Sequence, residues 1–578
     1  MSAPPPSPHP SPPPARDCEG DGPSPCPGRV VEPYRACLAH LTAQQAGDHF
    51  ATLSAGSDID HRGTRFTADL LTRLVRSLRD QATDAPKAGS ASFDGAVFTE
   101  AADFEGMRFT GTASFEGATF HAEANFIGAA FEAAAYFRRA KFIDSCDFAG
   151  AVFARYAGFS GAEFGGEHAN FYWTTFHGVA GFVSAVFSAR LDAARAWFYS
   201  DLLLRKSEFV TPQVVGPLVC AQTVDLRGAA FREQALLALC APYVNCQDTR
   251  WDAPCSLRLR YAVVSLNMAS LAAPCAVGRQ RRPFKVWGED VREDPVRGVT
   301  DDVKVRGVGS VDASLLRLMN VDLSECQFSA SFNLDQIRIE GACRFASTPR
   351  GWVRHHGFVP FHWTRRQIIA EEGILRRRAG RGHLAGGRRN TARESRHRDF
   401  ALAAAIYRSL RKALEDAKDE PGAADFYYGE MEMRRHSRKW SEAERWLLQA
   451  YWLLSGYGLR ASRALGWLGL AMMSTVVLMM GFGLPQDSPR QEATGTVPAG
   501  GGKVTFVIDE DDPENPSGER FTTQRFEKAL KVTLNSVVFR SSEQNLTTAG
   551  DYIEMASRFS EPILLGLGAL AVRGRVKR

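Results

Sequence analysis

Residues 91–142 read ASFDGAVFTEAADFEGMRFTGTASFEGATFHAEANFIGAAFEAAAYFRRAKF, and the spacing within them decides the fold. Phenylalanine recurs there in steps that alternate between five and six residues, and comparable steps continue to Phe187. The run holds 18 such phenylalanines, 15 of which have alanine two positions earlier, with Met107, Cys146 and Thr174 as the exceptions. This regularity indicates a structural repeat.

An extended backbone explains why alanine and phenylalanine are paired. Residues i and i−2 lie on one face of a strand, so each alanine points inward together with its phenylalanine. A step of five or six residues fits neither the 3.6-residue period of a helix nor a long strand, so the chain must turn after each pair. The pattern predicts a coil of short strands with phenylalanine rings stacked along its axis.

These residues resemble the pentapeptide-repeat family, whose motif has Phe or Leu at its centre and Ala two positions before it. The resemblance implies a mainly β fold, a right-handed quadrilateral β-helix. The same steps return between Leu318 and Phe345, so we expect one β-helix over residues 89–349 with an inserted loop near 278–308.

The residues before the repeats divide into two predicted parts. The Pro-rich residues 1–29 lack an apolar core and are expected to be a disordered tail. Residues 30–88 contain two amphipathic stretches, which predict a helical N-terminal cap over the first rung. The 11 cysteines of the chain form no CxxC pair, which predicts buried thiols in a reducing compartment. The histidines show no metal-ligand spacing either. We expect no enzyme activity, no catalytic residue, no cofactor and no metal site.

Residues 350–455 are predicted to connect the β-helix to a membrane module. Residues 350–398 are rich in arginine and read as a basic linker, or as a patch attracted to anionic lipid at about 1 kcal/mol per charge. Residues 399–455 are expected to form a helical hairpin and an interfacial helix, with Pro421-Gly422 between the two hairpin helices.

Residues 456–578 are predicted to form a two-helix transmembrane module. Ala464–Leu484 carries no charge and is long enough to cross a hydrocarbon core about 30 Å thick. Basic residues precede this span, whereas residues 485–520 carry eight acidic and three basic side chains and are expected to form an acidic external loop. A second, less apolar span over 553–572 would return the basic C-terminus to the cytoplasm. We therefore expect an integral protein of the bacterial cell membrane with its N-terminal bulk and C-terminus cytoplasmic.

The runs ADFYYGEME at 424–432 and LSGYGLR at 454–460, placed before an apolar span, resemble pentapeptide-repeat proteins that end in a two-helix, potassium-channel-like pore. The resemblance implies a pore helix, matched by Phe526–Phe539, and then a selectivity filter. The filter position is occupied by a degenerate sequence without the Gly-Tyr-Gly core: Thr547, Thr548, Ala549, Gly550 and Asp551. Potassium dehydration needs successive rings of carbonyl groups, which this sequence has no obvious means to form.

Two functions remain open. The first, favoured by the degenerate filter, is a membrane-anchored scaffold or interaction protein. It would contact the lipid bilayer and a protein partner on the β-helix surface, and its membrane module is a candidate for homo-oligomerisation. The alternative is an ion channel with a cytoplasmic repeat domain. Mimicry of DNA is disfavoured because residues 91–200 hold only 12 acidic groups against 7 basic ones, and no nucleic-acid partner is expected.

Overall fold

The computed structural model describes residues 17–18, 26–296, 298, 300, 302–348, 351–354, 360–363, 366–381, 389–485, 500, 520–538 and 546–576. The chain divides into two compact units. The first comprises Met1–Ala385 and Ile406–Asp419, and the second comprises Gly386–Ala405 and Glu420–Arg578. The acidic external loop predicted at 485–520 lies, apart from its ends and residue 500, outside the described residues.

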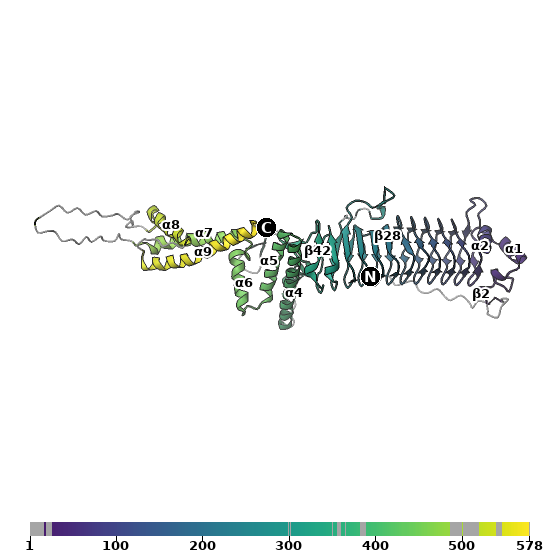
Figure 1. Cartoon of the computed structure of the whole chain (residues 1–578), viewed down its shortest axis with the longest axis horizontal. Coiled ribbons are helices and arrows are strands. Elements are labelled where there is room, and N and C mark those ends of the chain that lie inside the picture. The colour runs from purple at the N-terminus through teal and green to yellow at the C-terminus, as the bar shows by residue number, and fades with distance from the viewer. Residues whose placement is uncertain are drawn as a thin grey trace. The chain divides into compact units, whose positions relative to one another are not determined.

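The first unit is a parallel β-solenoid of about 11 turns (Figure 1). Its strands stack into four parallel sheets that run along the solenoid. The sheets extend from β5 (Lys87–Ala88) to β42 (Arg338–Glu340), from β3 (Ile59–Asp60) to β40 (Lys304–Gly307), from β4 (Arg65–Phe66) to β36 (Ser270–Leu271), and from β8 (Ala102–Asp103) to β24 (Arg190–Asp192). Most of these strands have two residues, which confirms the predicted coil of short strands.

Stacked phenylalanine rings fill the axis, as the spacing predicts. The alanines and phenylalanines of the pairs between 91 and 187 are at most 4% exposed. In one ladder the ring centroids of Phe115 and Phe137 lie 4.9 Å apart, and those of Phe137 and Phe159 lie 4.8 Å apart. Stacked aromatic pairs add about 0.5–1.5 kcal/mol beyond the area that they bury. The ladders therefore hold each coil on the next.

The length and number of the strands in each coil change where phenylalanine stops recurring at regular steps. Four long strands succeed one another there: β28 (Gln213–Cys220), β31 (Ala235–Cys240), β34 (Cys255–Arg260) and β37 (Cys275–Arg279). After β24 the five-stranded sheet ends, and the coils from β25 (Trp197–Phe198) to β36 carry three strands each, whereas the coils after β36 carry fewer. Ala235 pairs with Cys255, twenty residues on, whereas Ala113 pairs with Ala135, 22 residues on. In these coils one long strand thus takes the place of two short strands and the turn between them.

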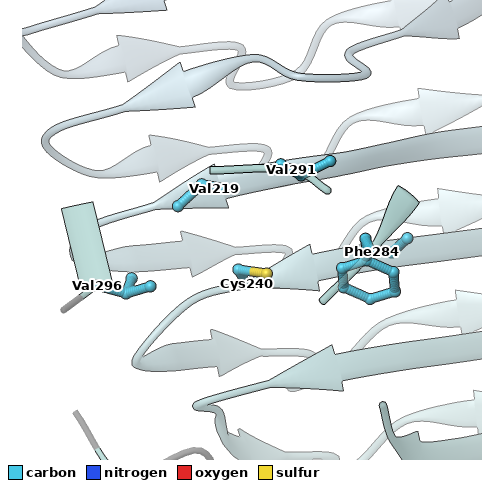
Figure 2. Close-up of a cluster of buried hydrophobic side chains, with 6 residues drawn as sticks. Val219, Cys240, Phe284, Val291 and Val296 are labelled. Atoms are coloured by element: carbon cyan, nitrogen blue, oxygen red, sulfur yellow. The ribbon is translucent and has the colours of Figure 1, made fainter. Parts of the chain in front are cut away.

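The insertion after β37 is a packed element. It contains a small hairpin of β38 (Lys285–Val286) and β39 (Glu289–Asp290). Its apolar side chains form one buried cluster with residues of β28 and β31 (Figure 2), namely Phe284, Val291 and Val296 with Val219, Ala238 and Cys240. Glu293 pairs with the Arg260 guanidinium at 2.6 Å and accepts a hydrogen bond from the Tyr261 hydroxyl at 2.5 Å. The predicted polar loop therefore covers a solenoid face.

The solenoid begins earlier than predicted. Helices α1 (Ala43–Thr52) and α2 (Ala68–Ser77) lie within the predicted cap, but β3 and β4 already pair in register with β6 (Ala91–Ser92) and β7 (Val97–Phe98). Thr64 and Phe66 are buried and take the inward positions of an Ala–Phe pair, with threonine in place of alanine. Within the predicted tail, β1 (Asp17–Cys18) and β2 (Cys26–Arg29) form an antiparallel pair, so residues 1–29 are not wholly a tail.

Residues 350–398 are more than a linker. Strand β43 (Ala346–Ser347) pairs with β46 (Gln367–Ile368), and β44 (Gly351–Arg354) pairs with β45 (Pro360–Trp363). Helix α3 (Ala370–Arg381) follows, and α4 (Arg389–Asp416) begins within the same region. The prediction of a linker was wrong here. An arginine-rich composition suggests solvent-exposed charge, but it does not show that some of these arginines have buried acidic partners.

The second unit is helical. Its helices are α5 (Glu420–Ser437), α6 (Ala443–Ser455), α7 (Ala461–Leu478) with a terminal π-turn over Met479–Gly483, α8 (Thr523–Val537) and α9 (Thr548–Val576). Pro421 and Gly422 lie in the first turn of α5 and do not separate two helices, because proline fits the first turn, where its missing N–H has no partner to lose. Helix α8 occupies the place predicted for a pore helix.

Candidate functional site

Two helices of the second unit are long and apolar enough to cross a membrane: Ala461–Gly483 and Thr548–Arg573. Only 28% and 33% of their most apolar windows are buried in the structure. Large apolar side chains are exposed along both: Leu465, Trp467, Leu470, Met473, Val477 and Phe482 on the first, and Tyr552, Met555, Phe559, Ile563, Leu565 and Leu570 on the second. A core helix of a soluble protein would bury such side chains.

The residues predicted as a degenerate filter form the junction between these helices. Thr548 to Asp551 make the first turn of α9, and Thr547 precedes that turn. The Thr547 hydroxyl donates to the Phe482 carbonyl at 2.6 Å and accepts from the Gly550 N–H at 3.0 Å. The Thr547 N–H donates to the Gly483 carbonyl at 2.9 Å. The segment thus caps α9 and ties it to the end of α7.

A buried carboxylate joins three helices near the middle of α9. Glu561 has no exposed surface, and it accepts hydrogen bonds from the Thr475 hydroxyl of α7 at 2.8 Å and the Ser536 hydroxyl of α8 at 2.7 Å. Ionisable side chains between membrane helices are costly and usually have a functional or packing role. From the sequence alone, Glu561 is a charge that interrupts the second span and, with Glu554, one of two candidate partners of Arg558. A glutamate directly before Pro562 in an apolar run was the available signal.

A buried arginine donates hydrogen bonds to the backbone carbonyl groups at the C-terminal end of α7. Arg525 of α8 is 1% exposed and donates to the carbonyl oxygens of Met480 at 3.0 Å, Leu484 at 2.8 Å and Pro485 at 2.9 Å. Carbonyl groups at the end of a helix have no partner within it, and a guanidinium can satisfy several of them at once. Arg525 therefore fastens α8 to the π-turn.

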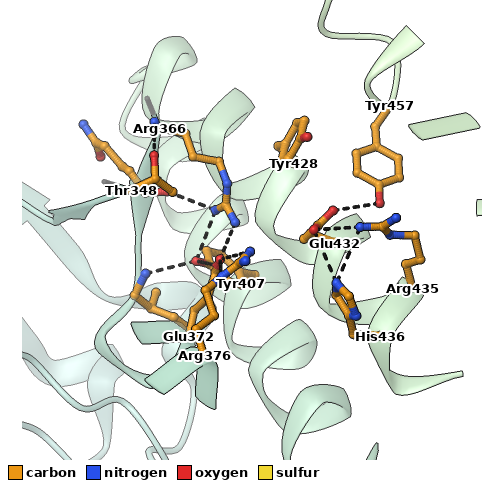
Figure 3. Close-up of polar contacts among 12 residues, drawn as sticks. Thr348, Arg366, Glu372, Arg376, Tyr407, Tyr428, Glu432, Arg435, His436 and Tyr457 are labelled. Carbon is orange, nitrogen blue, oxygen red and sulfur yellow. Dashed lines mark hydrogen bonds and ion pairs between the residues drawn. The ribbon is translucent and has the colours of Figure 1, made fainter. Parts of the chain in front are cut away.

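The first unit holds a buried ionic cluster at the C-terminal end of the solenoid (Figure 3). The Glu372 carboxylate pairs with Arg366 at 2.5 Å and with Arg376 at 2.6 Å, and it accepts from the Tyr407 hydroxyl at 2.5 Å. Burial alone would raise the pKa of the Glu372 carboxyl, but the two guanidinium groups and the hydroxyl outweigh it and hold that pKa below its usual value. The cluster packs α3 against the Ile406–Asp416 part of α4.

A second cluster, within the helical unit, supports the turn before α7 (Figure 3). Gly456, Tyr457 and Gly458 all have positive φ, of 56°, 59° and 73°. Tyr457 is 1% exposed, and its hydroxyl donates to the Glu432 carboxylate at 3.0 Å. Arg435 pairs with the same carboxylate at 2.8 Å. The Gly-Tyr-Gly sequence is therefore a strained turn between α6 and α7, held by a buried carboxylate.

Helix α6 presents an exposed apolar surface beside these residues. Trp446 is 59% exposed and Leu447 is 68% exposed, and Trp440 lies just before the helix at 54% exposure. Arginine side chains lie over the buried Trp452 ring, with Arg435 at 4.5 Å and Arg463 at 5.1 Å from its centre. The Arg445 guanidinium lies 4.6 Å from the centre of the exposed Trp440 ring, so an exposed tryptophan of this surface also lies next to arginine. Tryptophan is enriched where a helix meets a membrane surface.

Nine of the 11 cysteines are buried, which confirms the predicted burial. Sequence spacing did not reveal that Cys18, Cys26 and Cys37 come together with His40. The four residues lie on β1, on β2 and at either end of a short turn, so their proximity depends on the strand pairing.

Comparison with known proteins places the repeats in a family. Residues 93–141 match the model of the family described as pentapeptide repeats (9 copies). These residues lie within the phenylalanine ladders, so this part of the solenoid is similar to pentapeptide repeats. No curated protein and no solved structure matches the chain.

Proposed function

We propose that the protein is a membrane-anchored pentapeptide-repeat scaffold, in which α7 and α9 cross the bacterial cell membrane and the solenoid offers a surface to a protein partner. The observation that carries the proposal is the exposure of large apolar side chains along two helices long enough to span a bilayer. Leaving apolar surface in water costs about 25 cal/mol per Å², and contact with lipid removes that cost.

The distribution of charge and aromatic residues supports one orientation. Arg460 and Arg463 flank the start of α7, and exposed Trp446 and Trp467 lie where an interfacial belt is expected. The positive-inside rule then gives a cytoplasmic N-terminal bulk and C-terminus, with residues 485–520 as the external loop.

The solenoid of this proposal is a right-handed β-helix that is quadrilateral where each coil has four strands. Its outer surface carries ladders of opposite charge between coils, such as Lys141–Glu163 at 3.1 Å. Exposed pairs of this kind contribute little to stability. Their charges can instead determine which partner binds the surface. The scaffold role includes no enzyme activity and no nucleic-acid partner, and the membrane helices are the surface through which copies would associate.

The alternative, an ion channel, has less support from the geometry. Thr548 to Asp551 lie in a helical turn, where each carbonyl points along the helix axis towards an N–H group further on. A filter needs carbonyl groups that face an ion path. The junction geometry therefore favours an anchor over a pore.

Cysteine labelling in intact cells tests anchoring and orientation together. The native protein is its own control, because its 11 cysteines all lie before residue 344 and should remain unlabelled by an impermeant maleimide. Glu510→Cys should be labelled in intact cells, and Lys577→Cys only after permeabilisation. Labelling at position 577 but not at 510 would contradict the orientation. Release of the protein from membranes by alkaline carbonate would contradict the anchor itself.

A further inference from the structure

Four side chains with metal-ligating atoms converge at the N-terminal end of the solenoid. Cys18 ends β1, Cys26 begins β2, and Cys37 and His40 flank a single 3₁₀ turn. Their ligand atoms all lie within 4.8 Å of one another. The sulfurs of Cys26 and Cys37 are 3.7 Å apart, and the His40 Nδ1 lies 3.4 Å from the sulfurs of both Cys18 and Cys37.

The sulfur–sulfur distance of 3.7 Å and the two sulfur–nitrogen distances of 3.4 Å are close to those of a tetrahedral zinc site. Zinc binds sulfur at about 2.3 Å and imidazole nitrogen at about 2.0–2.1 Å, so tetrahedral angles set the sulfurs about 3.8 Å apart and sulfur about 3.6 Å from nitrogen. A disulfide requires a sulfur–sulfur distance of about 2.05 Å, much shorter than the 3.7 Å between Cys26 and Cys37. The cluster therefore fits a shared cation better than a covalent bond.

We propose that Cys18, Cys26, Cys37 and His40 bind one Zn²⁺ ion as a structural site with three thiolates and one imidazole. Four protein ligands complete the tetrahedral shell and leave no position open for substrate, so the site is structural. Each cysteine gives up its proton when the metal binds, and the free energy of binding adds to the free energy of folding.

Backbone groups around the cluster suit thiolate ligands. The Gly28 N–H lies 3.4 Å from the Cys26 sulfur, and the Cys37 N–H lies 3.2 Å from the Cys18 sulfur, and both donate. Such donors orient metal ligands and stabilise their negative charge. Gly28 also has to be glycine, because a Cβ there would stand 2.6 Å from the Cys37 Cβ and 2.7 Å from its sulfur.

The site connects the N-terminal hairpin to the first coil. The Arg29 N–H donates to the Arg62 carbonyl at 2.7 Å, and the Arg29 guanidinium lies 3.5 Å from the Asp60 carboxylate. Gly63 approaches the Pro27 carbonyl so closely that a Cβ would stand 2.1 Å from its oxygen. Strand β3 is the first strand of its sheet, and β2 lies at the same end of the solenoid (Figure 1). A bound metal would hold the hairpin over an end that otherwise invites strand association.

Metal analysis of the full-length protein tests the site. The protein is purified in detergent under reducing conditions, without a histidine tag or chelator, and its zinc is measured by plasma mass spectrometry. We expect one zinc per chain. After exchange, Co²⁺ should give the visible absorption of a tetrahedral ion and a thiolate charge-transfer band in the near ultraviolet.

Three variants separate the site from general effects on folding. Cys26→Ser should lose the metal, and Cys343→Ser, a half-buried cysteine outside the cluster, should keep it. His40→Cys retains four ligands, so it should keep one metal while its Co²⁺ spectrum changes. Zinc-free, folded native protein without a Co²⁺ spectrum would overturn the proposal. A Cys26–Cys37 disulfide found by mass spectrometry in protein alkylated at lysis would also overturn it.

Discussion

Gly550, in the first turn of α9, lies directly against Gly483 at the end of α7, and a Cβ on Gly550 would stand 2.4 Å from the Gly483 carbonyl oxygen. Two glycines are thus the reason that the helices meet so closely at this end, as small residues allow in membrane helix pairs. Gly568 lies against Leu465 of α7, with a Cβ at 3.3 Å from its side chain, whereas a Cβ on Gly566 would contact nothing. Gly568 therefore lies in the contact between the two helices, and Gly566 does not.

The contrast between two glycines of one helix gives the first prediction. Gly550→Ala should destabilise the helical unit, because the added methyl group collides with backbone that cannot move aside. Gly566→Ala should be neutral or stabilising by up to about 1 kcal/mol, since alanine favours the helix and meets open space. Thermal denaturation of the detergent-solubilised variants measures both. Equal effects at the two positions would contradict the packing at the α7–α9 junction.

The Glu372 cluster gives a prediction about pH. Because the pKa of the folded Glu372 carboxyl is held below its unfolded value of about 4.5, its contribution to stability is complete above that value. It is lost as the pH falls through the lower, folded pKa. Burial lowers the pKa of His61 in the same unit to about 3, so stability should already fall gradually below about pH 6.5. We expect a steeper fall below about pH 4, and Glu372→Gln should make this acid-induced part smaller.

Removing the carboxylate tests the same cluster at neutral pH. Glu372→Ala leaves the Arg366 guanidinium buried beside Tyr407 without its acidic partner, which should cost about 3–5 kcal/mol. Lys412→Ala is the control, since it breaks only an exposed pair with Asp335 and should change stability little. Similar losses in the two variants, measured by urea unfolding, would mean that the cluster is not a stabilising centre.

The sequence predicted the solenoid well where alanine and phenylalanine recur at the inward positions of each strand. The Ala–Phe pairs needed only strand geometry and the size of a phenylalanine ring, so their inward direction could be derived and is confirmed by burial. The repeat could not be recognised from the sequence where other residue types occupy these inward positions. Thr64 replaces alanine in the first coils, and the long strand Ala235–Cys240 buries aliphatic side chains in place of phenylalanine.

The polar clusters could not be predicted from residue spacing, because their members come from separate helices and strands. Arg366, Glu372 and Tyr407 meet only after α3 and α4 are packed, and Glu561 finds its hydroxyl partners on two other helices. Cys18 and Cys26 are brought together by the antiparallel pairing of two short strands. Composition reports such residues as charges or thiols, and only the fold shows their partners.

The alanines of the ladder provide a prediction about the core. Ala129 has no exposed surface and lies two residues before the buried Phe131, so Ala129→Leu should overpack the rung at a cost of about 1–3 kcal/mol. Glu132→Ala removes only an exposed pair with Arg108 and should change stability by less than about 0.5 kcal/mol. Hydrogen exchange of peptides from residues 113–142 measures both. A neutral Ala129→Leu variant would contradict the inward assignment of alanine.

The last prediction separates an anchor from a pore. Purified full-length protein in planar bilayers should show no potassium-selective current, because Thr548 to Asp551 form a helical turn and do not present rings of carbonyl groups to an ion path. The useful variant is Asp551→Asn, which alters the charge of that turn and leaves the Gly550–Gly483 contact in place. In an anchor, this variant should be as silent as the native protein while both remain inserted, as judged by carbonate extraction. Reproducible potassium-selective currents in the native protein, changed in conductance or selectivity by Asp551→Asn, would make the channel the primary function.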